Sequence, residues 1–256
     1  MPPRALILHA AGTNRDHEAA QALRLAGALP EIVPLNALRQ GSHLWSDFQL
    51  LVIPGGFSYG DALGAGKLLA LDLQAYFADQ VRAFVEQGKP VVGICNGFQA
   101  LVKAGLLPGD GRSQATLTFN ASGRFECRWV TLLPASRRCL WTAGLVEPIY
   151  CPVAHGEGRF LPARSDLIGE LSASGQIALT YALSGGTPAN GAYPENPNGS
   201  TADIAGICNA AGNVLGLMPH PEDHVLPYQH PRWTRGEAGR MGLPLFQNAV
   251  RHLEAA

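Results

Sequence analysis

Residues 89–101 carry the strongest structural signal in this sequence: Lys89-Pro90-Val91-Val92-Gly93-Ile94-Cys95-Asn96-Gly97-Phe98-Gln99-Ala100-Leu101. The apolar, β-branched run over residues 91–94 is typical of a parallel strand that is buried on both faces. The apolar residues from Phe98 onward recur at helical spacing. The stretch therefore predicts a strand, a sharp corner at Cys95 and a helix that begins directly after it.

Cys95 stands midway between Gly93 and Gly97, which is the spacing of a nucleophile elbow with cysteine in place of serine. At such a corner the nucleophile is held in a strained backbone conformation, and a β-carbon at either flanking position would crowd the strand or the helix. The helix N-terminus after the corner favours a thiolate and a developing oxyanion. The alternative, which the spacing alone leaves open, is that Cys95 is an ordinary buried thiol.

Before this stretch, segments typical of strands alternate with segments typical of helices. Such alternation predicts a parallel sheet with functional sites at the carboxyl ends of its strands. We expect strands at residues 5–9, 31–35 and 49–53, and helices at residues 19–28 and 65–86.

After the elbow helix the pattern changes, because strands follow one another with little helix between them. We expect strands at residues 128–133, 149–153 and 177–181, a long loop over 185–200, a β-hairpin formed by 203–208 and 214–218, and a last helix over 245–255. The sequence therefore predicts an α/β fold, with a mostly parallel sheet flanked by helices and an antiparallel extension. We expect residues 1–256 to form a single domain.

Composition narrows the function classes. With a net charge of -1 and a pI near 6.7, the chain has no basic excess, so neither nucleic acid nor membrane is expected as a partner. No apolar run approaches the ~20 residues of a membrane span, and residues 1–4 show no signal-peptide pattern. The cysteines form no CxxC pair and the histidines have no metal-ligand spacing. We expect a cytoplasmic protein with no metal site and no disulfide framework.

A cysteine nucleophile needs a base that takes its proton and returns it to the leaving amine. His220 follows a predicted strand and so can reach the same edge of the sheet as Cys95. Glu222 stands two residues further on, beside Pro221, and can orient the imidazole. Taken alone, the His-Pro-Glu tripeptide is also compatible with an exposed loop.

Pro54-Gly55-Gly56-Phe57 ends another predicted parallel strand. A glycine turn at this place can offer a backbone N–H to an oxyanion, with the N–H of Asn96 as the second donor. An ordinary strand-ending turn is the alternative.

The polar loop Pro152-Val153-Ala154-His155-Gly156-Glu157-Gly158-Arg159-Phe160 lies between predicted strands. Its charged side chains are compatible with two interpretations: a contact with a substrate or partner, or a solvated turn. The residues of the loop alone do not decide between them.

Together these residues resemble the class I (triad) glutamine amidotransferases, and most closely the family of glutaminase subunits of phosphoribosylformylglycinamidine synthase. The resemblance covers nearly the whole chain. It implies the three-layer fold of these amidotransferases. The matching segments keep the family's order and are residues 12–16, 54–61, 93–99, 152–160, 196–200, 204–209 and 216–222.

The resemblance implies a glutaminase mechanism. Cys95 attacks the side-chain amide of glutamine, His220 acts as the base and Glu222 orients it. Ammonia leaves and water hydrolyses the glutamyl thioester. The oxyanion and substrate are expected to meet a further set of residues from the same motifs: Gly55, Gly56, Phe57, Asn96 and Gln99.

The resemblance also implies partners. A synthetase subunit uses ATP and Mg to convert formylglycinamide ribonucleotide to the amidine in purine biosynthesis, and a small third subunit completes the complex. No cofactor is expected in this chain, which carries no ATP-binding motif. His155, Glu157 and Arg159 are expected to face the synthetase.

Two departures from the family pattern stand out. Asp223-His224 follows the triad carboxylate where a basic residue is expected, and the 227–244 loop is longer than in compact members. Two other functions stay open: a different elbow-cysteine hydrolase, which would not need the His-Pro-Glu pairing, and a non-catalytic glutamine-binding regulatory domain, which the loss of a triad member would favour.

Overall fold

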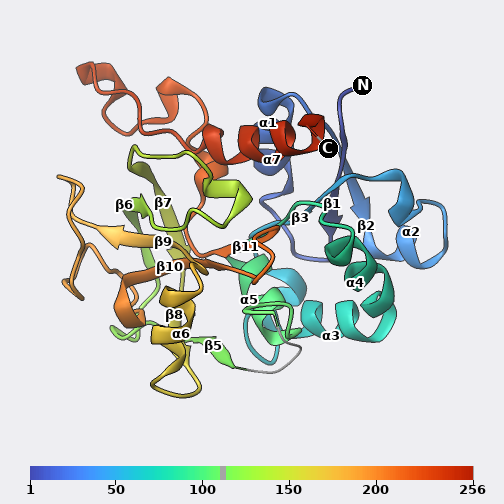
Figure 1. The fold of residues 1–256 in the computed structure, drawn as a ribbon, viewed down its shortest axis with the longest axis horizontal. Helices are drawn as coiled ribbons and strands as arrows, with labels where there is room; N and C mark the ends of the chain where they lie inside the picture. Colours follow the sequence, from blue (N-terminus) through green and yellow to red (C-terminus); the bar gives the residue numbers. More distant parts are fainter. Residues whose placement is uncertain (110–113, 256) are drawn as a thin grey trace.

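The computed structural model describes residues 1–109 and 114–255. A nine-stranded sheet runs through the molecule (Figure 1). Its strands lie in the order β2 (Leu29–Pro34), β1 (Arg4–His9), β3 (Leu50–Ile53), β4 (Val91–Ile94), β11 (Val214–Leu217), β10 (Ile204–Cys208), β9 (Ile177–Ala182), β6 (Glu126–Pro134) and β7 (Ile149–His155). Neighbours from β2 to β11 are parallel, and the remaining pairs are antiparallel. The predicted fold, with its antiparallel extension, is confirmed.

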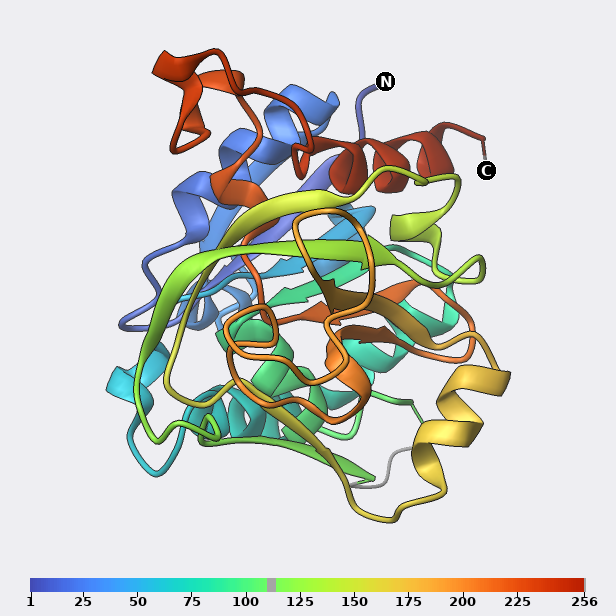
Figure 2. The ribbon, with the colours of Figure 1, turned by 90° about the vertical axis from the view of Figure 1, so that its left-hand side faces the viewer.

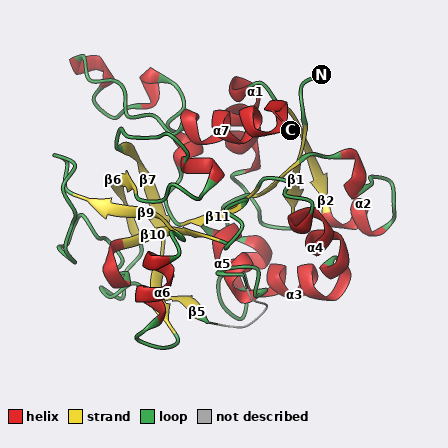
Figure 3. Ribbon diagram, in the orientation of Figure 1, coloured by secondary structure: helices red, strands yellow, loops and turns green. Residues whose placement is uncertain are grey.

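Helices cover both faces of the parallel half of the sheet and so form the outer layers (Figure 3). On one face lie α1 (Asp16–Ala26) and α7 (Leu243–Ala255), which pack against each other. On the other face lie α3 (Lys67–Tyr76), α4 (Ala78–Glu86) and α5 (Asn96–Lys103). Because both faces are covered, the strands between them are continuous apolar runs, and every residue of β3 and β4 is buried.

The helix predicted over residues 65–86 is in fact two helices that meet at Phe77. This residue leaves the helical conformation, with φ at -132°, and its buried ring contacts Trp45 at 5.5 Å between ring centroids. Helical periodicity continues on both sides of the break, which is why the sequence pattern did not show it.

The elbow helix α5 lies against the sheet at unusually short range. A β-carbon on Gly97 would stand 1.9 Å from the carbonyl oxygen of Ile53, and one on Gly93 would stand 2.5 Å from Cδ1 of Leu101. The crowding predicted for these two positions is confirmed. Close contact of this kind fixes where the N-terminus of α5 lies relative to the neighbouring strand ends.

Several short elements were not predicted. A second sheet pairs β5 (Ala115–Thr118) with β8 (Arg159–Pro162), and two short helices are α2 (Leu35–Arg39) and α6 (Leu167–Ala173). Figure 2 shows the segment of residues 225–242 as a projection beside α7, built from turns and short 3-10 helices. Among residues 1–109 and 114–255, no helix has the length and apolar character needed to cross a membrane.

Candidate active site

Cys95 occupies the corner between β4 and α5 with φ 49° and ψ -103°, a strained conformation for a residue with a side chain. Its N–H donates to the carbonyl of Leu217 on the adjacent strand at 2.7 Å, which holds the corner against β11. The side chain is 5% exposed, and its sulfur lies 3.7 Å from the carbonyl oxygen of Ala154. The backbone thus has the form predicted for a nucleophile elbow.

His220 reaches Cys95 because β11 pairs in parallel with β4, so that both residues follow the carboxyl ends of neighbouring strands. The N–H of His220 donates to the carbonyl of Pro152 at 2.8 Å, which fixes its backbone. Nδ1 of His220 lies 2.7 Å from Oε1 of Glu222, and both side chains are buried. The structure therefore brings Cys95, His220 and Glu222 together in one buried site.

Burial by itself disfavours a charged imidazole. Electrostatic attraction to Glu222 and Cys95, together with hydrogen bonds to both, outweighs this effect and raises the pKa of His220 well above its ordinary value. Nε2 of His220 makes no hydrogen bond to a nitrogen or oxygen of the described residues. This arrangement favours an imidazolium that is oriented by Glu222 through Nδ1 and that holds a proton at Nε2.

The Gly55-Gly56-Phe57 turn lies directly against the base. A β-carbon on Gly55 would stand 2.7 Å from Cε1 of His220, so only glycine leaves room for the imidazole. Gly56 has φ 124°, and a β-carbon there would strike Asn14 at 2.6 Å. Phe57 donates its N–H to the carbonyl of Gly12 at 3.2 Å and is therefore engaged. The Phe57 N–H is thus not available to an oxyanion, and the Gly56 N–H stays the expected donor of this turn.

Asn96 and Gln99 lie on the first turn of α5, and both are buried. As the first helical residue, Asn96 has an N–H without a partner inside the helix. Gln99 donates from Nε2 to the carbonyl of Glu157 at 2.6 Å and accepts from Nδ2 of Asn96 at 3.3 Å. In this structure the Gln99 amide ties α5 to the 155–159 loop, and its predicted contact with glutamine stays a prediction.

The three residues expected to face a partner lie in different surroundings. Glu157 and Arg159 are partly exposed, and Arg159 donates from Nε to the carbonyl of Gly199 at 3.1 Å. His155, in contrast, is only 3% exposed, so the expectation that its side chain faces a partner is wrong. It is the last residue of β7, and alternation along this strand places it on the buried side.

His155 instead forms the wall of the site. Burial and the nearby His220 lower the pKa of His155 to about 3, so the imidazole is neutral. Its Nδ1 lies 3.2 Å from Oδ1 of Asn120, and Asn120 also bonds the carbonyl of His155 and the N–H of Gly158. Asn120 thereby fixes the 155–158 loop.

Asn120 was missed by the sequence interpretation, which gave it no role. It begins Asn120-Ala121-Ser122, which matches only the glycosylation acceptor pattern, and nothing local marks a role in the site. Ser58 and Asp61 belong to a motif that was noted, yet no role was assigned to them. Both contact Asn96, as described below.

A possible metal-binding group overlaps the site, since ligand atoms of His220, Glu222 and Asp223 all lie within 4.8 Å of one another. Nδ1 of His220 is already hydrogen-bonded to Glu222, so a metal ion at this place would disrupt the pair that orients the base. Nη1 of Arg15 stands 3.7 Å from Oδ1 of Asp223, so a cationic side chain already pairs with this carboxylate. The absence of a metal stays a prediction.

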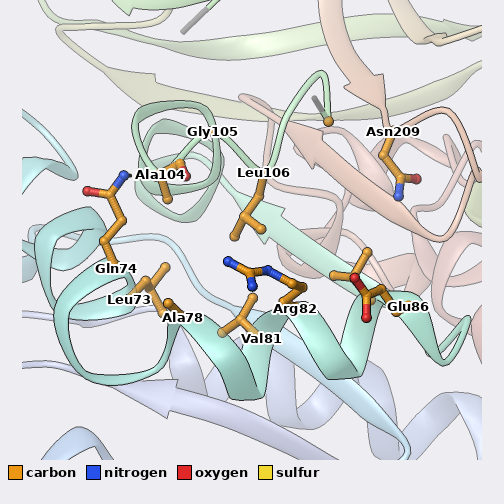
Figure 4. Close-up of a pocket in the computed structure, with 12 residues that line it drawn as sticks. Leu73, Gln74, Ala78, Val81, Arg82, Glu86, Ala104, Gly105, Leu106 and Asn209 are labelled. Carbon is orange, nitrogen blue, oxygen red and sulfur yellow. Dashed lines mark hydrogen bonds between the residues drawn. The ribbon is translucent and has the colours of Figure 1, made fainter. Parts of the chain in front are cut away.

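A hollow of about 640 Å³ lies away from these residues, between α3, α4 and the end of α5 (Figure 4). Apolar side chains line it together with Arg82 and Glu86, and none of the triad residues is among its lining. It is therefore not the substrate site.

Comparison with known proteins supports this interpretation. Residues 2–253 match the family model described as the CobB/CobQ-like glutamine amidotransferase domain. The chain is 54% identical to phosphoribosylformylglycinamidine synthase subunit PurQ of Treponema denticola, over 99% of this chain and 100% of the relative. It is 44% identical to the PurQ subunit of Dehalococcoides mccartyi, over 97% of this chain and 96% of that relative.

Solved structures of known proteins show the same similarity. A chain of the PurLQS structure from Thermotoga maritima is 33% identical and superposes with a TM-score of 0.77, over 99% of this chain and 100% of that chain. A glutamine amidotransferase from the same organism, at 15% identity and a TM-score of 0.57 over the full length of both chains, shares the fold. On this evidence the chain belongs to the CobB/CobQ-like glutamine amidotransferases and, among them, to the family of PurQ subunits of phosphoribosylformylglycinamidine synthase.

Proposed function

We propose that this chain is the glutaminase subunit of phosphoribosylformylglycinamidine synthase and that Cys95 is its nucleophile. The observation that carries the proposal is the buried set of Cys95, His220 and Glu222 at the ends of two paired strands, in a member of the PurQ family. The same set argues against a binding-only domain, which would not need an intact triad.

In the first half of the reaction, the Cys95 thiolate attacks the side-chain carbonyl carbon of glutamine. The carbonyl oxygen becomes an oxyanion, which the N–H groups of Gly56 and Asn96 stabilise. The carbon–nitrogen bond then breaks. His220 gives the proton on Nε2 to the leaving amine, so that ammonia departs and a glutamyl thioester remains on Cys95.

In the second half, His220 is neutral and takes a proton from water. The hydroxide adds to the thioester carbonyl and the carbon–sulfur bond breaks. The new side-chain carboxyl loses its proton to water, and glutamate is released. The thiolate and the imidazolium are thereby restored. Glu222 holds the Nδ1–H of His220 at 2.7 Å throughout, which keeps one tautomer and stabilises the charged form.

The ammonia is passed to a synthetase subunit, which uses ATP and Mg to convert formylglycinamide ribonucleotide to the amidine. A small third subunit completes the complex, as in the PurLQS assembly named for the Thermotoga maritima structure. This chain is expected to need no cofactor of its own. Its place in purine biosynthesis points to the cytoplasm as its location.

Exposed apolar side chains beside the site support docking of the synthetase there. Phe57 of the glycine turn stacks on Phe125, with ring centroids 6.5 Å apart, and both rings are exposed. Leu63 and Phe119 are also exposed and line a hollow of about 630 Å³ together with Glu157. Monomeric proteins rarely gather exposed apolar groups in this way without an interaction partner.

The test is glutamate release from glutamine by the chain alone, by its complex with the synthetase subunits, and by the Cys95→Ala complex. We expect partner-dependent release that the substitution abolishes, while synthesis from added ammonia continues. Release that survives in Cys95→Ala would remove the elbow from the mechanism. A complex that uses free ammonia but never releases glutamate would identify the chain as a binding module.

A further inference from the structure

The side chain of Asn96 joins two segments that are far apart in the sequence. Its Oδ1 accepts from the hydroxyl of Ser58 at 2.5 Å, and its Nδ2 donates to Oδ1 of Asp61 at 2.9 Å. Ser58 and Asn96 are each 2% exposed. We call the three residues Ser58, Asp61 and Asn96 the amide clamp, since the Asn96 amide is held on both sides by the loop that follows Gly56.

The clamp connects the two halves of the oxyanion site. Gly56 belongs to the loop after β3, and Asn96 belongs to the first turn of α5. Their N–H groups stabilise one oxygen atom only if their separation is fixed to within a fraction of an ångström. Inside the loop, no element of regular sheet or α-helix holds residues 55–61 against α5.

The loop backbone is strained, so it needs such support. Tyr59, Gly60 and Asp61 follow one another in the left-handed region, with φ values of 56°, 63° and 54°. Non-glycine residues in this region cost on the order of 1 kcal/mol each, and they persist only where surrounding contacts impose them. The Asn96 amide contacts Asp61, the last residue of this strained run, and Ser58, the residue directly before it.

Other contacts of the loop lead elsewhere. The N–H of Tyr59 donates to the carbonyl of Ala11 at 2.6 Å, and the Tyr59 hydroxyl bonds Asp72 on α3. These bonds anchor the outer side of the loop to the segment after β1 and to α3. Close packing of Gly97 on Ile53 fixes α5 against the end of β3, and the clamp extends this fixed spacing to residues 58–61 of the loop.

We propose that Ser58, Asp61 and the side chain of Asn96 are positioning residues that set the distance between the oxyanion donors of Gly56 and Asn96. This inference rests on the proposed function, because an oxyanion forms only if glutamine is hydrolysed through Cys95. The clamp touches neither the sulfur nor the base directly, so it acts on the acyl-transfer transition state rather than on the reactivity of the thiolate.

The test compares Ser58→Ala, Asp61→Ala and Asp61→Asn in the complex with the synthetase subunits. Loss of a well-placed oxyanion donor costs about 100-fold in kcat. We expect Ser58→Ala and Asp61→Ala to lower kcat for glutamine hydrolysis about 10-fold to 100-fold, with KM changed less than about three-fold, because a displaced donor is a partial loss.

Asp61→Asn is the conservative variant. It keeps the Oδ1 acceptor and tolerates a left-handed backbone. Burial and the Glu157 charge raise the pKa of Asp61, so a neutral amide fits this environment. We expect it to retain kcat within about three-fold of the unmodified complex. Ser46→Ala and Asp47→Ala, at exposed positions before β3 and at the opposite end of that strand from the site, are the matched controls.

A second measurement distinguishes a loss of oxyanion stabilisation from a general disturbance of the Cys95 elbow. Alkylation of Cys95 by iodoacetamide is a displacement that forms no oxyanion, so its rate should stay within about two-fold in all variants. If alkylation and kcat fall together, or if kcat is unchanged in both alanine variants, the proposal is overturned. Activity that survives in Cys95→Ala would refute the proposed function instead, whatever the clamp variants do.

Discussion

The parallel half of the sheet and the antiparallel extension contribute to the site in different ways. Cys95 and His220 follow directly from β4 and β11, two buried strands paired in register. The antiparallel strands contribute the 155–158 loop, which Asn120 holds through hydrogen bonds to His155 and Gly158. In the parallel half, the ends of two strands position Cys95 and His220. In the antiparallel half, the side chain of Asn120 positions the loop that lies beside them.

This difference shows which positions tolerate change. At Gly97 in the parallel half, one added carbon would meet the backbone carbonyl of Ile53. On α6, beside the antiparallel half, a β-carbon at Gly169 would meet nothing within 4 Å. Substitutions at these two glycines should therefore differ in size and in sign.

The largest effect is expected from Glu222→Gln in the parallel half. An amide cannot stabilise the imidazolium and does not enforce the same tautomer, so kcat should fall about 1,000-fold and the pKa of His220 should drop. Steady-state glutamine hydrolysis in the complex, measured across pH, checks both expectations. Glu254→Gln, at an exposed position near the end of α7, is the control, and equal activities of the two variants would contradict the role given to Glu222.

Gly97→Ala should give the next largest effect. The added carbon would stand 1.9 Å from the carbonyl oxygen of Ile53, so α5 must move away from β3. Overpacking of this kind should lower the free energy of unfolding by about 3 kcal/mol. Urea unfolding of the isolated chain measures it. A loss below about 0.5 kcal/mol would show that the contact between α5 and β3 is not rigid.

The buried imidazole of His155 should make the antiparallel half sensitive to acid. Its pKa is lowered to about 3 in the folded chain, whereas the unfolded value is near 6.5, so the unfolded state binds the proton first. The stability that depends on neutral His155 is present above pH 6.5 and is lost as pH falls towards 3. Between pH 7 and pH 5 the loss is about 2 kcal/mol.

The measurement compares the unmodified chain with His155→Gln by urea unfolding at both pH values. Asp223, whose pKa is raised to about 6, has the opposite pH dependence, because its folded form binds the proton first. Its contribution cancels when the two proteins are subtracted. A difference that does not change between pH 7 and pH 5 would mean that His155 is not held neutral.

The smallest effect is expected from Gly169→Ala on α6. The position is helical and open, so alanine should stabilise the folded chain by about 0.5–1 kcal/mol, through the smaller conformational freedom of the unfolded chain. The sign is thus opposite to that of Gly97→Ala. If Gly169→Ala instead lowers the free energy of unfolding, then the difference in packing around Gly97 and Gly169 does not decide whether alanine is tolerated there.

Much of the fold could be predicted because its strongest signals are local. Apolar runs over residues 50–53 and 91–94 indicated buried parallel strands, and the hairpin of β10 and β11 followed from two runs around a turn. The elbow was recognisable because Gly93, Cys95 and Gly97 lie within five residues. Local spacing reflects local geometry, so these predictions needed no knowledge of distant contacts.

Other features depend on contacts between distant residues, which a single sequence does not record. The break at Phe77 brings its ring against Trp45, which lies more than thirty residues earlier in the chain. The burial of His155 comes from the strand it ends and from Asn120. A polar loop with a histidine looks exposed in sequence, and only the tertiary structure shows that this side chain is covered.

The sequence by itself indicated the elbow cysteine and most of the strands and helices around it, because the pattern of each lies in neighbouring residues. The tertiary structure decided which polar groups meet: the Asn96 amide with Ser58 and Asp61, and Asn120 with His155. The physical reason is that a buried polar group must find a hydrogen-bond partner, and packing chooses that partner from any part of the chain.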